Sequence, residues 1–128
     1  MAADEAPAGR LPLAAYLLLT GLQSWLAMTL PIMADEAYYS DWSETVALGY
    51  LDHPPMIAWL LALCPPRVLA IVSLHTGLCF CWLTARHLGF RRAAWVPVAL
   101  LATPLGLVGG VIATPDAPLF MFWCALIY

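Results

Sequence analysis

The chain alternates between long apolar runs and short polar turns. Four runs are nearly free of charge, and a helix needs about 20 apolar residues to cross about 30 Å of hydrocarbon. These runs are residues 11–30, 67–84, 93–112 and 119–128. The third contains two prolines and a Gly-Gly pair, and the fourth is long enough for about half a crossing. The pattern predicts three membrane-spanning helices and a partial fourth.

The segment between the first two runs, residues 31–66, has a different pattern. Tyr38, Trp42 and Val46 recur at a spacing of four, opposite the face that carries Glu44. This spacing predicts an amphipathic helix within residues 34–50 that lies at the membrane interface. A rigid Asp-His-Pro-Pro turn follows, and then a second short apolar helix, residues 56–64, before a Pro-Pro pair. We therefore expect one long outer loop with interfacial helices.

Composition places the chain in the membrane. Of its 128 residues 63% are hydrophobic and 10% are charged, with a mean hydropathy of +0.84, whereas a soluble domain is about a quarter charged. The predicted fold class is an all-α integral membrane protein, with a polar tail at residues 1–10 and a membrane domain at residues 11–128. The net charge of −3 and the lack of lysine exclude the basic patch that nucleic acid requires.

The four cysteines do not predict a metal site or a disulfide framework. Three of them lie in apolar runs, where cysteine acts as a small buried hydrophobic residue. Cys79 and Cys81 are two apart on a predicted helix, so their side chains point away from each other. They are therefore no zinc pair.

Arginine positions predict the orientation. Three of the five arginines lie at residues 86–92, between the second and third spans. The positive-inside rule places this turn in the cytoplasm. Residues 31–66 and the later turn Thr114–Pro118 then both fall on the outer face. Two acidic turns that are far apart in sequence are thereby expected at one side of the membrane.

The carboxylates at these two turns are candidates for catalysis. Asp35 and Glu36 directly follow the first span, where a low dielectric and a like charge raise the pKa of a carboxyl group. Such a group can act as a general base. Asp116, between two prolines, is a candidate second acid. The alternative for all three is an ordinary helix start, because acidic side chains are favoured near the positive end of the helix dipole.

Four other polar residues each allow two interpretations. Asp52 and His53 form either a phosphate-facing or metal-binding turn, or an ordinary interfacial turn. Arg67 either pairs with a lipid phosphate or extends its charge to the interface along the apolar surface. His75 lies in the middle of a span, where an ionisable residue suggests function. It either ligates a haem or pigment metal or forms a hydrogen bond between helices.

Three motifs in this order resemble the N-terminal part of bacterial glycosyltransferase family 39 in the GT-C superfamily, which is related to protein O-mannosyltransferases and aminoarabinose transferases. The motifs are DEAYY at Asp35–Tyr39, GYLDHPPMIAW at Gly49–Trp59 and TPDAPLFMFW at Thr114–Trp123. The resemblance covers residues 11–128. It implies a multi-span enzyme of the bacterial inner membrane that transfers a sugar from a polyprenyl-phosphate lipid to an acceptor on the periplasmic face.

The resemblance also implies roles for individual residues. Asp35 would be the general base or acceptor-orienting acid, Glu36 would support it, and Asp116 would match the second acidic position. His53 falls where relatives place a lysine near the carrier phosphate, and neutral imidazole brings no fixed charge there. Asp52 falls where relatives carry an acid that helps to bind a divalent metal.

Two further expectations follow. Arg67, on the same predicted face, would supply a second phosphate donor. The chain is several times shorter than family members, so it is expected to be one piece of a longer enzyme and too short to be active alone. The alternative is a truncated, non-catalytic subunit that packs against membrane lipids and other subunits of a larger complex.

Overall fold

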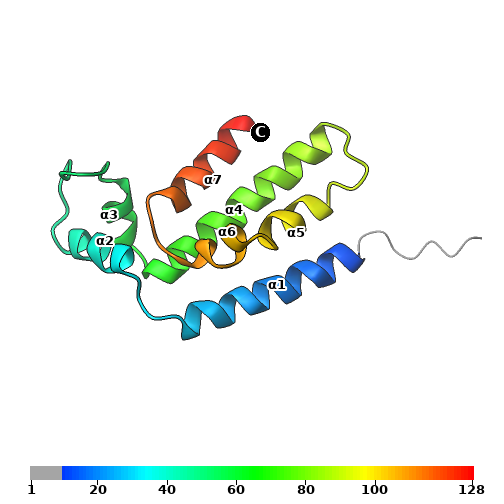
Figure 1. The fold of residues 1–128 in the computed structure, drawn as a ribbon. Coiled ribbons are helices and arrows are strands. Elements are labelled where there is room, and N and C mark those ends of the chain that lie inside the picture. Colours follow the sequence, from blue (N-terminus) through cyan, green and yellow to red (C-terminus); the bar gives the residue numbers. More distant parts are fainter. Residues whose placement is uncertain (1–9) are drawn as a thin grey trace, which may run out of the picture.

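The computed structural model describes residues 10–128, so most of the predicted polar tail lies outside the described residues. This part of the chain is helical and contains no strand (Figure 1). Two helices are long and apolar enough to cross a membrane, α1 (Arg10–Thr29) and α4 (Pro66–His87). The predicted all-α class is therefore confirmed, and the two helices are compatible with a membrane protein.

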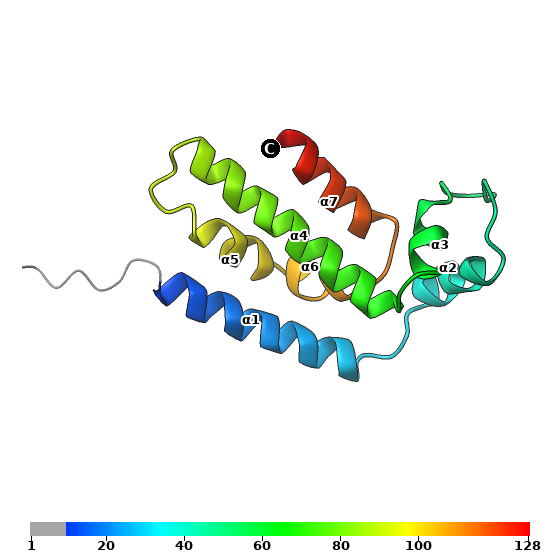
Figure 2. The same ribbon diagram turned by 180° about the vertical axis from the view of Figure 1, so that it is seen from behind.

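Helix α4 is the centre of the structure. Pro66 stands at its first position, where a missing N–H costs nothing. Arg86 and His87 in its last turn complement the helix dipole, and Gly89 beyond the end has a φ of +77°. The helix packs against α7 (Asp116–Ile127) on one side and α5 (Trp95–Leu101) on another (Figures 1 and 2).

The apolar run 93–112 is not one continuous helix. It divides into α5, α6 (Pro104–Leu107) and a 3₁₀ turn η1 (Gly109–Val111). Pro104 has no N–H to continue α5 and disfavours helical backbone in Thr103 before it. The Thr103 hydroxyl instead caps α6 by accepting from the Gly106 N–H at 2.9 Å. The predicted third span is divided into short helical pieces for this reason.

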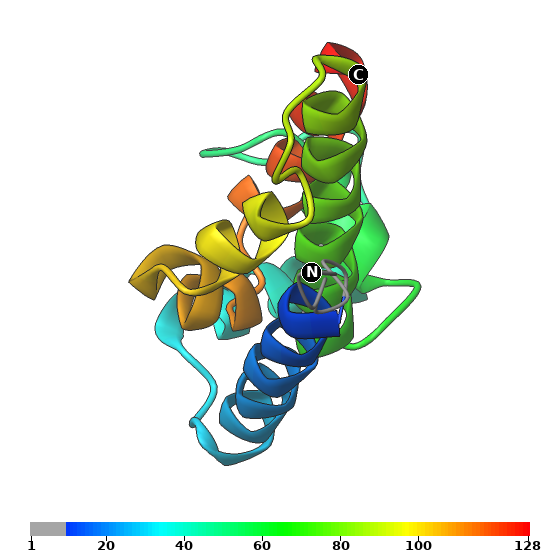
Figure 3. The same ribbon diagram turned by 90° about the vertical axis from the view of Figure 1, so that its right-hand side faces the viewer.

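Helix α1 lies beside α5, α6 and η1, as the end-on view in Figure 3 shows. Only Pro12 and Gln23 of its 20 residues are buried. Large apolar side chains cover the rest of its surface, and Leu18 and Met28 are 75% and 87% exposed. An apolar surface of this extent requires lipid or another protein chain against it.

The predicted outer loop contains two short helices, as expected, although their bounds differ. Helix α2 covers Ala34–Glu44 and α3 covers Met56–Leu61. We expected the first to continue to Gly49, but the Tyr50 hydroxyl lies 2.9 Å from the Trp42 and Thr45 carbonyl oxygens. A side chain thus takes up carbonyls that another helical turn would have used. Val46 lies outside the helix and is exposed.

A small core holds α2 and α3 against one end of α4. Its buried side chains come from α2, α3, α4 and the segment before α7; they are Tyr39, Ile57, Leu61, Leu69, Ala70 and Ala113. Residues far apart in sequence are therefore joined at the end of the bundle where α2 and α7 begin (Figure 1).

Candidate functional site

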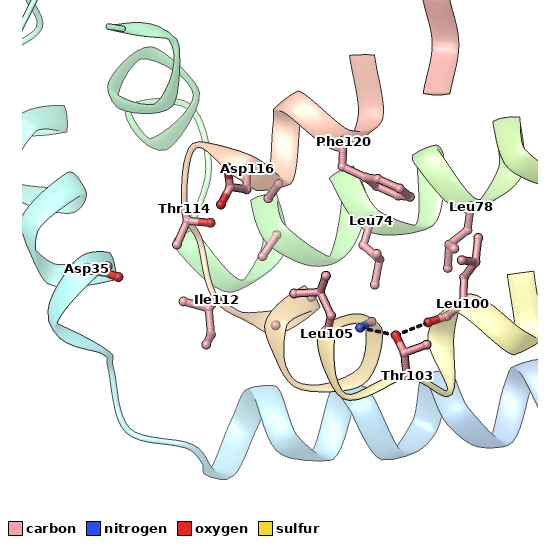
Figure 4. A pocket seen from close by; sticks show the side chains of 15 residues that line it. Asp35, Leu74, Leu78, Leu100, Thr103, Leu105, Ile112, Thr114, Asp116 and Phe120 are labelled. Carbon is pink, nitrogen blue, oxygen red and sulfur yellow. Dashed lines mark hydrogen bonds between the residues drawn. The ribbon is translucent and has the colours of Figure 1, made fainter. Parts of the chain in front are cut away.

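Two cavities meet where α2 and α7 begin. The first, of about 390 Å³, lies among α4, α5, α6 and α7, and the second, of about 340 Å³, lies among α2, α3 and the start of α7. Asp35, Thr114 and Asp116 line both. Figure 4 shows Asp35 approaching from α2, with Thr114 and Asp116 across from it near the start of α7. The structure therefore brings together the two acidic turns, as the sequence predicted.

The first cavity is apolar beyond these acids. Its walls are formed mainly by side chains of α4, the α5–α6 segment and α7, among them Leu74, Leu78, Leu100, Leu105 and Phe120 (Figure 4). Gly106, Gly109 and Gly110 also line it. Gly110 has no room for a side chain, because a Cβ there would lie 2.4 Å from Leu74 Cδ2. The space can hold an apolar chain whose polar end meets the carboxylates.

The second cavity adds His53 and Tyr39 to the acids. The two rings meet edge to face, with centroids 5.7 Å apart. Tyr39 is buried, and burial raises the pKa of its phenol above the ordinary value; the charges of Asp35, Asp116 and Asp52 raise it further. Asp35 and Asp116 line the same cavity as this phenol. Neutral Tyr39 can donate a hydrogen bond at neutral pH.

Asp52 lies beside this cavity rather than in a metal cluster. Its Oδ2 accepts a hydrogen bond of 2.6 Å from the Tyr38 hydroxyl, and this bond raises the pKa of Tyr38. Within residues 10–128, no three histidine, cysteine, aspartate or glutamate side chains lie close enough together to hold a metal ion. Asp52 therefore belongs to no such cluster in this part of the chain.

Glu36 and Arg67 are bound to each other and to the backbone. Glu36 is 1% exposed, and its Oε2 lies 2.8 Å from Arg67 Nη2. The same oxygen accepts from the Met33 N–H at 3.1 Å, and Oε1 accepts from the Ala113 N–H at 3.2 Å. The buried carboxylate thus holds one guanidinium and two backbone N–H groups of the site in place.

The Arg67 guanidinium has two further acceptors. Nη2 donates to the Pro31 carbonyl at 2.7 Å and Nη1 donates to the Val111 carbonyl at 3.0 Å. The guanidinium therefore joins the α1–α2 connection, the first turn of α4 and the segment before α7. We assign Glu36 and Arg67 to positioning the site, since their charges neutralise each other and their other hydrogen bonds go to the backbone.

His75 belongs to a network inside the bundle and lines neither cavity. Gln23, which is fully buried, donates from Nε2 to the Gly106 carbonyl at 3.1 Å. Its Oε1 therefore faces His75 Nε2, at 2.8 Å, so this nitrogen carries the proton. Tyr16 donates to the other ring nitrogen, Nδ1. With both nitrogens engaged, no lone pair is free for a haem or pigment metal; His75 joins helices instead.

Sequence reasoning missed Thr114, Tyr39 and Gln23. Thr114 and Tyr39 lie within the motifs that we singled out, but their neighbours carry the charges. Gln23 could have been found, because it is an amide inside a predicted span and an unpaired amide is costly in hydrocarbon. Tyr16 lies seven residues before it, on the same face of a helix.

Comparisons with models of protein families, with curated proteins and with solved structures found no match for this chain. We take Asp35, Asp116 and His53, with Tyr39 and Thr114 between them, as the candidate active site.

Proposed function

We propose that the chain is the N-terminal membrane region of a polyprenyl-phosphate-sugar-dependent glycosyltransferase, related to family 39, that transfers a sugar to an acceptor on the outer face of the bacterial inner membrane. The observation that carries this proposal is the shared lining of the two cavities. Asp35 and Asp116 stand between an apolar space and a second space to which His53 and Tyr39 add polar groups. A lipid-linked sugar needs both kinds of space within reach of a base.

The candidate residues divide the chemistry between them. Asp35 takes the proton of the acceptor hydroxyl, whose oxygen attacks the anomeric carbon and forms the new glycosidic bond. The bond from that carbon to the carrier phosphate breaks, and its electron pair leaves with the phosphate. Attack opposite the leaving group inverts the anomeric centre. His53 donates a hydrogen bond to the departing phosphate, and Asp116 orients the acceptor.

The proposal includes a membrane topology. α1 and α4 are proposed to cross the membrane fully, and the broken segment 93–112 and α7 to fill the bundle beside them. The arginine-rich turn at residues 86–92 stays in the cytoplasm. The α2–α3 loop and the start of α7 then face the periplasm, and the apolar cavity lies at the depth of the lipid tails.

The test is sugar transfer by membranes that contain the intact protein, with a labelled polyprenyl-phosphate sugar as donor. Replacing Asp35 by Asn should reduce turnover about 100-fold or more, because the general base is lost. The matched control is Asp41→Asn, an exposed residue of the same helix that lines neither cavity. Undiminished transfer by the Asp35 variant would contradict the proposal.

A second function, a non-catalytic subunit derived from such an enzyme, is favoured by the apolar surface of α1. Leu17, Leu18 and Trp25 are each more than half exposed, which suits a contact with a larger membrane complex as well as lipid. The Asp35→Asn and Asp116→Asn double variant separates the two functions. A subunit would keep its complex and cellular role in this variant, whereas an enzyme would lose activity while its assembly stays intact.

A further inference from the structure

Helices α4 and α7 pack closely along a line of small residues. On α4, Ser73, Gly77, Cys81 and Ala85 recur every four residues and therefore share one face. A Cβ added at Gly77 would lie 2.4 Å from Cε1 of Phe120 on α7, so the contact depends on glycine. Small residues allow helices in a membrane to approach this closely.

The α4–α7 packing keeps the same register beyond the contact between Gly77 and Phe120. The two helices lie side by side and run in the same direction (Figures 1 and 2). Four residues after Gly77 and four after Phe120, the next pair in line is Cys81 and Cys124, whose sulfur atoms are 3.5 Å apart. Cys124 is buried and Cys81 is half-buried. Packing of the whole interface, rather than a chance side-chain rotamer, brings the thiols together.

We propose that Cys81 and Cys124 form a modification site, at which reversible two-electron oxidation creates a disulfide between α4 and α7. A disulfide needs sulfur atoms about 2 Å apart. Rotation of the two side chains can close the remaining gap while the helices stay in place. The observations behind this site do not depend on the proposed sugar transfer.

The reaction needs an oxidant that enters an apolar region, and the class we name is the small diazenes, whose N=N bond accepts both electrons and both protons. The half-buried Cys81 thiol adds to the oxidant and its proton passes to the oxidant. The Cys124 sulfur then attacks the Cys81 sulfur. The S–S bond forms, the bond to the oxidant breaks, and the second proton leaves with the reduced oxidant.

The bond would act on the first cavity. α4 contributes Leu74 and Leu78 to its wall, and α7 contributes Phe120. A covalent link one turn beyond Phe120 fixes these walls against each other. The oxidised protein therefore has a cavity of fixed width, whereas the reduced protein relies on packing alone.

The positions of the arginines give a direct test. Arg86, Arg91 and Arg92 are exposed between the two cysteines, and Cys124 is the one cysteine that follows them in the sequence. The full chain in lipid vesicles is treated with the diazene diamide, blocked with N-ethylmaleimide and cut by trypsin under native conditions. We expect the two fragments to stay joined on a denaturing gel and to separate only when a reductant is added.

Serine variants identify the partners. Cys81→Ser and Cys124→Ser should each abolish the link. The Cys64→Ser, Cys79→Ser double variant retains both proposed partners and should keep the link, whether or not the first two variants fold. Cys79→Ser is the matched single control, because Cys79 is exposed on the same helix. Separate fragments without reductant in the wild type and in the double variant would overturn the proposal. A link that depends on Cys79 or Cys64, or an oxidised uncut chain that runs as a dimer, would also overturn it.

Discussion

Arg67, in the first turn of α4, and Glu36, in the first turn of α2, form an ion pair of 2.8 Å with side chains that are 18% and 1% exposed. The pair accounts for the position of the neighbouring Asp35. Consecutive residues of a helix point about 100° apart, so anchoring Glu36 inward turns Asp35 toward the cavities. The Glu36–Arg67 ion pair thus sets the direction of the Asp35 side chain, the candidate catalytic carboxylate.

Breaking this pair should destabilise the protein strongly. Glu36→Gln leaves the Arg67 charge without its counter-ion in a site that excludes most water, and we expect a loss of about 3 kcal/mol in the free energy of unfolding. Unfolding in a denaturing detergent series measures this loss. The matched control is Glu44→Gln, at the exposed last turn of the same helix, with an expected change of about 0.5 kcal/mol or less.

Removing both charges of the pair tests whether Glu36 and Arg67 interact in the folded protein. Glu36→Gln combined with Arg67→Met should be less destabilising than the sum of the two single variants, because the second change removes the charge that the first leaves unpaired. Strictly additive losses would mean that the two side chains do not interact in the folded protein.

The buried network around His75 should also contribute to stability. Gln23→Leu removes the acceptor for His75 Nε2 and the donor to the Gly106 carbonyl, leaving two buried polar groups without partners. We expect a loss of about 2 kcal/mol. Ser24→Ala, at an exposed position of α1 where the hydroxyl bonds only its own helix, should cost much less. Equal losses in the two variants would contradict a role for the network.

Sequence alone could predict the class, the two long helices and the meeting of the acidic turns, because each depends on local composition or on charge. It could not predict the break in residues 93–112. Apolar content there is high enough for a span, and the outcome depends on Thr103, whose hydroxyl caps a new helix that begins at Pro104. Prolines also occur within spanning helices, so the sequence pattern alone does not decide whether residues 93–112 form one helix or several.

The site residues show the same limit. Asp35 and Asp116 could be singled out as acids at the ends of spans. The different role of Glu36 could not be predicted, because Asp35 and Glu36 are adjacent acidic residues and their positions in the sequence do not distinguish them. Only the partner, Arg67, which lies 31 residues further along the chain, decides which carboxylate is neutralised and which lines the cavities.

Titration of the Tyr39 phenol tests whether the carboxylates of the second cavity lie near it. Its pKa is raised by burial and by the charges of Asp35, Asp116 and Asp52. Between the ordinary tyrosine pKa of about 10 and the higher folded value, the unfolded chain binds fewer protons than the folded one. Stability linked to Tyr39 is therefore complete below pH 10 and is lost as the pH rises through the folded pKa.

The measurement is the ultraviolet absorbance of phenolate, taken as the difference between the wild type and Tyr39→Phe. Asp35→Asn or Asp116→Asn should move this titration to lower pH, because a negative charge beside the phenol is removed. Asp41→Asn, whose charge is not among the causes of the shift, should leave it in place. An unchanged titration in both cavity variants would place the carboxylates away from Tyr39.

Two glycines in the long helices should respond to alanine with opposite signs. At Gly77 a Cβ would lie 2.4 Å from Phe120 Cε1, so Gly77→Ala forces α7 or the Phe120 ring to move and should cost about 1 to 3 kcal/mol. At Gly21 a Cβ meets nothing within 4 Å. Gly21→Ala should stabilise the protein by about 0.5 to 1 kcal/mol, because alanine has less backbone freedom to lose. Detergent unfolding of the two variants measures both signs, and a loss at Gly21 as large as at Gly77 would mean that α1 packs against a surface that the present contacts do not include.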